Sequence, residues 1–410
     1  MRSAGRCNER ASNLPLGYNE GSQSAWFAPP EGEPIHKWRR WLMEHSTTVV
    51  GMDVHKVDIV ATILRPGDGP AVDGIRMANN GREIAKLVKR AGREAEYVYE
   101  AGPCGYEVQR QLEELGAKCH VVAPALTPVR PGDRVKTDKR DARKLARLWR
   151  AGELTAIRVP SREEEAARDV VRVREDALGD RLRARHRLGG FLLRQGRVWR
   201  ETKAWGTKHR EWLKKQEFGI PALQATFEAY LRGYEEAEAR LTEASAKVED
   251  MAGEECFRAY VCGMRCLKGV DTLTAMTLVA EAQDFRRFRT ASAFMCFAGL
   301  VGREDSSGET IRRGGITKAG NAHIRRVLIE AAWQYRRQNV TGGPLAERRK
   351  ECGDEGIRRY AQAAQDRLHR KFWRMISRGK ESRVAAVAVA RELAGFVWGM
   401  GNMVTASREV

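Results

Sequence analysis

The chain has 410 residues, and its 73 Lys and Arg against 54 Asp and Glu give a formal net charge of +19. Hydrophobic residues make up 42% and charged residues 31%, which excludes a disordered chain and, at this length, predicts two or three folded domains. So large a positive excess indicates a polyanionic partner, either nucleic acid or an anionic membrane surface. The longest strongly apolar stretches, such as 384–390, are too short to span a bilayer, so we expect no membrane association.

The first 46 residues are rich in Gly, Pro, Asn and Ser, and we expect them to form a disordered leader. From 47 to 160 the pattern predicts a compact α/β domain. The expected elements are strands at 48–53, 58–64 and 72–77, a helix at 82–91, a strand at 96–99, a helix at 106–115 and a strand at 118–122. Three antiparallel strands followed by alternating helices and strands are the order of a ribonuclease-H-like domain.

The middle of the chain, 161–257, is predicted to form a helical arm. Residues 130–215 contain 26 Lys and Arg against 13 Asp and Glu, whereas 230–255 is acidic, and both stretches are compatible with long helices. A basic helix next to an acidic one predicts a helical hairpin or coiled-coil arm; the alternative is two separately solvated helix faces. The last part, 258–410, is expected to be a mainly helical domain with glycine-rich breaks between 302 and 320.

Four carboxylates stand at positions where they can converge. Asp53 ends the first strand, and Glu100 ends the 96–99 strand. Asp138 and Asp141 are three residues apart at the start of a helix, so they share one face of it. Carboxylates from two strand ends and a helix start can hold two Mg²⁺ ions for phosphoryl transfer. The alternative for Asp138 is an ordinary helix cap, and Glu100 could be a strand-end charge.

Basic residues flank the second pair of carboxylates and are candidates for contact with a phosphate backbone. They are Lys136, Lys139, Arg140, Arg143 and Lys144.

A second candidate site lies in a basic, glycine-rich loop that contains Ser306 and Ser307 followed by Gly308. A serine there can approach a phosphodiester while nearby cations stabilise the developing charge, although a Ser-Ser-Gly sequence is more often a simple turn. The cations in and after this loop, which we expect to contact nucleic acid, are Arg312, Arg313, Lys318, Arg325 and Arg326.

Residues 267–275 resemble the turn of a helix-hairpin-helix, in which backbone amides at a helix start bind a phosphate. Asp271 occupies the place where a second glycine is usual, so the alternative is a helix capped by Asp271 or Thr272.

Taken together, these motifs resemble the DEDD transposases of bacterial insertion sequences, the insertion-sequence one-ten family that includes the Piv-type DNA invertases and is understood as bridge-RNA-guided recombinases. The resemblance extends from about 47 to 401. The matching segments are 50–56, 99–102, 136–142, 267–270, 297–301, 307–308 and 316–321. The position after 300–301 is often proline in relatives and is Gly302 here.

The resemblance implies a RuvC-like catalytic domain in which Asp53, Glu100, Asp138 and Asp141 bind Mg²⁺. It selects Ser307 over Ser306, because the family serine precedes a glycine, and implies that this serine forms a covalent link to DNA. The implied partners are donor and target DNA, a noncoding bridge RNA, for which the basic helices within 130–215 are a plausible seat, and further copies of the chain. A homodimer would assemble into a tetrameric synaptic complex in the bacterial cytoplasm, at the nucleoid.

Two rival interpretations use the same charge distribution. A RuvC-like structure-specific nuclease would use the four acids with water as the nucleophile and would treat the Ser307 segment as a turn. A non-enzymatic scaffold would bind RNA or DNA and carry an idle metal site. Only the second half of the chain separates these possibilities, because a hydrolytic nuclease does not need the serine loop or its cations.

Overall fold

The computed structural model describes residues 47–67, 71–128, 137–201, 203–304, 307, 310, 312–338 and 342–408. The leader 1–46, Lys136 and Ser306 lie outside these residues. The chain divides into two compact units, with the boundary between Val159 and Pro160. The first is a mixed α/β unit and the second is almost entirely helical, as the sequence predicts.

The first unit is built on a five-stranded sheet with the order β3-β2-β1-β4-β5. The strands β1, β2 and β3 are antiparallel neighbours, whereas β4 runs parallel to β1 and to β5. The bounds are β1 Val49–Val54, β2 Asp58–Leu64, β3 Val72–Ala78, α2 Gly81–Ala91, β4 Glu96–Glu100, α3 Glu107–Glu114, β5 Lys118–Val122, a short 3-10 helix Pro124–Leu126 and α4 Asp138–Arg150. This arrangement is compatible with the predicted ribonuclease-H-like domain.

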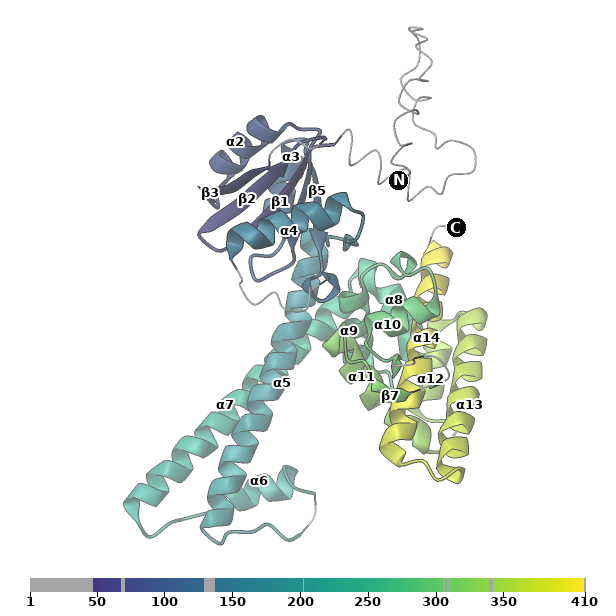
Figure 1. The fold of residues 1–410 in the computed structure, drawn as a ribbon. Helices are drawn as coiled ribbons and strands as arrows, with labels where there is room; N and C mark the ends of the chain where they lie inside the picture. Colours follow the sequence, from purple (N-terminus) through teal and green to yellow (C-terminus); the bar gives the residue numbers. More distant parts are fainter. Residues whose placement is uncertain are drawn as a thin grey trace. The chain divides into compact units, whose positions relative to one another are not determined.

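Helices cover both faces of the sheet (Figure 1). On one face, Val50 and Met52 of β1 pack with buried residues of α2 and α3. On the other, Val49 packs with Leu145 and Trp149 of α4. Successive side chains of a strand point to opposite faces, so odd-numbered residues of β1 face α4. Asp53 therefore lies on the α4 face.

The second unit begins with two long helices, α5 Arg162–Arg194 and α7 Pro221–Ala252, which lie side by side (Figure 1). Ser161 caps α5, and Glu164 completes a capping box. Phe191 of α5 packs against Phe227 near the start of α7, while Arg174 contacts Ser245 near its end, so the two helices are antiparallel. The short helix α6, Thr207–Lys214, lies in the connection between them.

The rest of the second unit is a helical body around α14, Ser382–Arg408. Its other elements are α8 Glu255–Arg265, α9 Thr272–Ala282, a 3-10 helix Phe285–Arg287, α10 Ala291–Phe297, the two-stranded hairpin β6 Gly302–Glu304 and β7 Arg313–Ile316, α11 Ala322–Ala332, a 3-10 helix Trp333–Arg336, α12 Pro344–Cys352 and α13 Glu355–Ser377. The segment Ser382–Ser407 is long and apolar enough to cross a membrane by length and composition. However, one face of it, including Val389, Leu393 and Val397, is fully buried in this body, as expected of a core helix.

Candidate active site

Asp53, the second-last residue of β1, and Glu100, the last residue of β4, lie near the ends of two neighbouring parallel strands on the same face of the sheet. The last pair in register between β1 and β4 is Met52 with Tyr99, and each carboxylate follows one residue later. In β4, Tyr97 and Tyr99 pack on the α2/α3 face, whereas Val98 packs with α4. Glu100 therefore has the orientation of Val98, towards α4. The structure places these two carboxylates at one edge of the sheet, and their role in metal binding stays a prediction.

Helix α4 lies directly on β1 because Gly51 has no side chain. A Cβ atom at Gly51 would lie only 2.1 Å from the carbonyl oxygen of Ala142 and 2.6 Å from the backbone nitrogen of Ala146. The N-cap of the helix is Thr137, whose hydroxyl accepts a hydrogen bond from the amide of Arg140. Asp138 is thus not the cap, and its carboxylate is directed to other groups.

Asp138 meets Asp53 through His55. The Nε2 atom of His55 lies 3.4 Å from Oδ2 of Asp53 and 3.8 Å from Oδ1 of Asp138. One ligand atom from each of these three residues lies within 4.8 Å of the other two, which is close enough to share one metal ion. Glu100 and Asp141 are not members of this group. Asp141 lies one turn further along α4 and is half-buried.

Arg76 on β3 completes the environment of Asp138. Asp53 pairs with Val60, and Val60 pairs with Arg76, so Asp53 and Arg76 lie in one row across three strands and point to the same face. The guanidinium of Arg76 donates one hydrogen bond to Asp138, at 2.9 Å, and another to Asp58. This cation partly neutralises the carboxylates at the sheet edge.

The four described cations of α4 that were predicted to contact phosphate differ in their exposure and in their contacts. The aliphatic stem of Lys139 lies over Gly74, and Arg143 forms an ion pair of 3.0 Å with Asp73. Arg140 is exposed and Lys144 is half-buried. The proposed contact of these four residues with phosphate stays a prediction.

Ser307 lies at the tip of the β6–β7 hairpin. It forms two backbone hydrogen bonds with Thr310, of 3.1 Å and 3.0 Å, and its side chain is exposed. The pair Ser307 and Thr310 continues the register of Glu304 with Arg313, so the strand pairing extends beyond the regular part of the hairpin. An exposed hydroxyl is therefore held on a paired backbone.

The segment after the hairpin, 317–321, is fixed tightly against 297–301. The amides of Thr317, Lys318 and Asn321 donate to the carbonyl groups of Val301, Gly299 and Phe297. Arg325 donates to the carbonyl of Ala298 at 3.1 Å. Both ends of the hairpin are thus anchored to the helical body.

Comparison with known proteins identifies the family to which these two sites belong. The family described as "Transposase IS116/IS110/IS902 family" matches 264–343, and the DEDD family of IS110 elements, described as "Transposase", matches 50–195. Transposase y4qE of Sinorhizobium fredii is 38% identical over 369 residues, which cover 88% of this chain and 90% of that relative. The transposase for insertion sequence element IS1533 of Leptospira borgpetersenii is 36% identical over 335 residues, 79% of this chain and 95% of that relative.

The chain belongs to the IS110 family of DEDD transposases. It is therefore a DNA transposase or recombinase of an insertion sequence, and its substrates are DNA.

A DEDD transposase uses a divalent metal ion, and the residues at the sheet edge fit one. Asp53 and Asp138 offer carboxylate oxygens, the ligands that hard cations prefer, and His55 offers a ring nitrogen, which is more usual for transition metals. His55 is not among the residues predicted from the sequence to form this site. The signal was available: His55 follows Asp53 by two residues, the spacing that keeps two side chains on one face of an extended chain.

Several charged side chains that follow the hairpin of the transposase form ion pairs within the second unit. Arg326 forms ion pairs with Glu175 of α5, at 2.9 Å, and with Glu330. Burial disfavours the charged form of Glu175, but hydrogen bonds from Arg326 and His323 more than offset this and hold its pKa below the usual value. Arg326 therefore links α11 to α5, and its predicted role in nucleic-acid binding is not tested by this arrangement.

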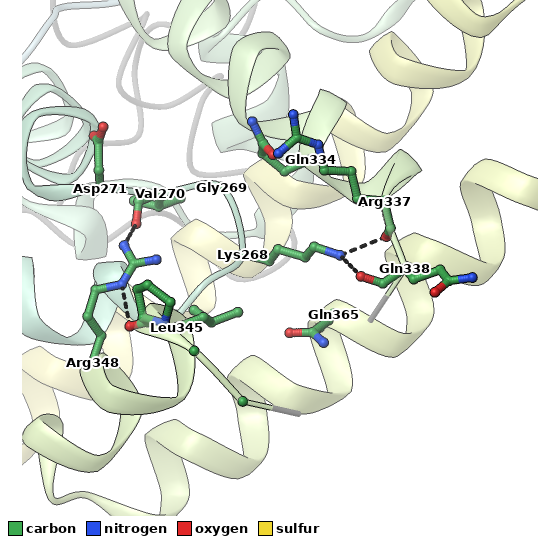
Figure 2. Close-up of a pocket in the computed structure, with 13 residues that line it drawn as sticks. Lys268, Gly269, Val270, Asp271, Gln334, Arg337, Gln338, Leu345, Arg348 and Gln365 are labelled. Atoms are coloured by element: carbon green, nitrogen blue, oxygen red, sulfur yellow. Dashed lines mark hydrogen bonds between the residues drawn. The ribbon is translucent and has the colours of Figure 1, made fainter. Parts of the chain in front are cut away.

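In the turn between α8 and α9, Asp271 caps helix α9, which is the second of the two alternatives considered for this segment. The carboxylate of Asp271 accepts from the amide of Thr274 and occupies the helix start that would otherwise face a phosphate. Figure 2 shows the pocket beside this turn, in which Lys268 donates to the carbonyl groups of Arg337 and Gln338. Arg348 donates to the carbonyl of Val270 at 2.9 Å. Since backbone carbonyl groups already engage two of its cations, this pocket is not a strong phosphate site.

Proposed function

We propose that this transposase cuts and rejoins DNA through a covalent link between Ser307 and a DNA phosphate. The observation that carries the proposal is the hydroxyl of Ser307, exposed at the tip of a hairpin whose backbone pairing reaches the serine itself. A nucleophile on a paired backbone is better positioned than one on a free turn, and positioning lowers the barrier of phosphoryl transfer.

In the proposed step, a bond forms between Oγ of Ser307 and the phosphorus, and the bond from phosphorus to one sugar oxygen breaks. The serine proton passes to solvent or a base, and the departing sugar oxygen gains a proton. The phosphodiester is exchanged for another phosphodiester, so no high-energy cofactor is needed. The reverse step, with a different sugar hydroxyl as the nucleophile, joins a new strand.

The carboxylate site supplies the second part of the proposal. We assign Asp53, Glu100, Asp138 and Asp141 as the acids that hold Mg²⁺; of these, Asp53 and Asp138 lie in one group with His55. A bound Mg²⁺ would stabilise the charge that develops on the phosphate oxygens. Arg76, hydrogen-bonded to Asp138, limits the repulsion among the carboxylates. The acids and the serine that act on one phosphate can come from the same copy of the chain or from two.

The basic helices within 130–215, which include α5 of the arm, are the proposed seat of a noncoding bridge RNA that pairs with donor and target DNA. Glu238 of α7 pairs with Arg185 and Arg210 and neutralises part of the basic charge. Arg187 and Arg194 of α5 are exposed and remain on the surface of the arm. RNA is bound largely through its backbone and shape, which suits such a surface. Homodimers assembling into a tetramer on DNA, in the cytoplasm, complete the proposal.

The test is the recovery of a covalent protein–DNA adduct on a denaturing gel. The full chain is incubated with the noncoding RNA of its element, Mg²⁺ and DNA that carries the element's junction. Ser307→Ala and Asp53→Ala should each abolish the adduct, whereas Ser306→Ala, the matched control, should retain it. Cleavage that persists in Ser307→Ala without any adduct would instead support a RuvC-like nuclease that uses water.

A further inference from the structure

A groove of about 650 Å³ lies between the β6–β7 hairpin and helix α14. This volume is within the roughly 300–1,000 Å³ of sites that bind small ligands. Its apolar surface comes from Leu300 and Ile316 on the hairpin side and from Val384 and Val387 on α14. Val384 is 50% exposed and is one of the few large apolar side chains of the described chain that are exposed.

The charged side chains that line the groove are all cations. Arg303 and Lys318 come from the hairpin side, and Arg383 and Arg391 come from α14. Arg383 also lies 3.8 Å from Glu381, an exposed and therefore weak ion pair. A fifth cation, Lys371, is paired with Glu392 of α14 at 2.7 Å and contributes little net charge. Only apolar, glycine or cationic residues line this groove among the described residues, so its surface favours an anion with an apolar face.

The cations stand at both ends of the apolar surface. Arg383, Val384, Val387 and Arg391 follow the spacing of one helix face, and the two arginines are about 12 Å apart along the axis. On the hairpin, Arg303 is four residues from Ser307, which limits the separation of their Cα atoms to about 14 Å. A strand held at Ser307 can therefore reach the groove within a few nucleotides, since each nucleotide of a duplex strand already spans about 3.4 Å.

The backbone on the hairpin side of the groove is held in an unusual conformation. Lys318 has a φ angle of +57°, a region that residues other than glycine rarely adopt. It is held there by close packing on both sides: a Cβ atom at Gly299 would lie 2.5 Å from the carbonyl oxygen of Ala319, and one at Gly320 would lie 2.2 Å from that of Phe297. Strained residues that the surrounding structure maintains are concentrated at functional sites.

We propose that this groove binds one unpaired nucleotide of the DNA strand that Ser307 attacks. The base lies on Val384, Val387 and Ile316, and the phosphates on either side contact Arg303 and the α14 arginines. An apolar surface suits the face of an unstacked base, which a duplex does not expose. The inference rests on the proposed role of Ser307, because the hairpin places the groove beside that serine.

The lining supplies hydrogen-bond donors but, among the described residues, no side-chain acceptors. Its cations can therefore bond phosphate oxygens and the acceptor atoms of a base, whereas the amino groups of a base find no side-chain partner. The expected occupant is a nucleotide of the DNA strand that Ser307 attacks.

The test measures the affinity of the full chain for a fluorescein-labelled 20-nucleotide single strand, the corresponding duplex and an RNA of the same sequence, by fluorescence anisotropy at several salt concentrations. The variants are Val384→Gln and the double change Arg383→Gln with Arg391→Gln. Trp373→Gln, which alters a large apolar side chain that is 45% exposed on α13, and Arg359→Gln on the same helix are the matched controls.

Val384→Gln should weaken single-strand binding about five-fold, with duplex binding and the salt dependence unchanged. The double arginine variant should weaken it about ten-fold and reduce the slope of log affinity against log salt by about 1.4, since each phosphate contact with a single strand contributes roughly 0.7. Equal losses for single strand and duplex would overturn the proposal, as would a loss confined to RNA or normal affinity in both groove variants.

The adduct assay separates this inference from the proposed function. If Ser307→Ala abolishes the adduct while the groove variants bind and react normally, the groove proposal alone fails. If the wild-type chain forms no adduct but its single-strand affinity depends on Val384, the serine mechanism fails and the groove proposal stands.

Discussion

Replacing Gly51 by alanine should separate helix α4 from the sheet and thereby disrupt the carboxylate site. The added methyl group would lie 2.1 Å from the carbonyl oxygen of Ala142 and 2.6 Å from the nitrogen of Ala146. Both contacts are with helix backbone, which cannot move aside as a flexible side chain can. Overpacking costs typically 1–3 kcal/mol, and we expect the upper end, about 3 kcal/mol.

Hydrogen exchange of the full chain, followed by mass spectrometry, measures the loss of local stability in β1 and α4. A loss of about 3 kcal/mol corresponds to roughly 100-fold faster exchange of the most protected amides, and we expect it in peptides from β1 and α4. The matched control is Gly81→Ala at the first residue of α2, where the new methyl group would lie 3.7 Å from the side-chain oxygen of Gln111. That change should leave protection equal or slightly higher. Unchanged protection of α4 in Gly51→Ala would refute the close approach of the helix to β1.

Three further outcomes are expected. His55→Gln should raise the divalent-metal concentration for half-maximal adduct formation by about 10–100-fold, and an unchanged requirement would exclude His55 from the metal site. Glu281→Ala should lower the melting temperature by several degrees, because the buried Glu281 carboxylate receives two hydrogen bonds from Arg172, at 2.7 and 3.1 Å; an unaltered melting curve would contradict this. Although burial raises it, the pKa of Glu175 lies below 4.5 because Arg326 and His323 donate to its carboxylate. The contribution of this carboxylate to the free energy of unfolding is therefore present above pH 4.5 and lost as the pH falls further. On acidification, the free energy of unfolding of Glu175→Gln should fall less than that of the wild type.

The sheet and its two carboxylates could be predicted because their determinants are local. Short continuous apolar runs, 49–52 in β1 and 97–99 in β4, define the two strands, and a carboxylate directly follows each run. Gly51, in the middle of a buried strand, is the local sign of a close backbone approach. Asp138 was harder to interpret, since an aspartate near a helix start is usually a cap; only the structure shows that Thr137 caps α4.

The contacts that depend on register could not be predicted in the same way. Arg76 reaches Asp138 because β3 and β2 pair in one particular register, and β3 is a weak strand in the sequence. The pairing of Arg172 with Glu281 joins residues that are 109 positions apart. Neither residue shows a local pattern that selects its partner, so tertiary packing alone determines both contacts.

The buried carboxylate of Glu281 also bears on how the serine hairpin is held. Its two oxygens receive hydrogen bonds from Arg172 of α5 and, at 2.7 Å, from Asn321, the residue that caps α11 directly after the hairpin segment. The base of the arm and the base of the hairpin therefore share one buried acceptor, and neither can shift alone without leaving a charged or polar group unpaired, which costs about 1–3 kcal/mol. If RNA binds the arm and DNA binds beside the hairpin, as proposed, the two ligands contact elements that this buried carboxylate joins. A displacement of Arg172 with α5 would then disturb the hydrogen bond from Asn321 at the start of α11, directly after the segment that anchors the hairpin.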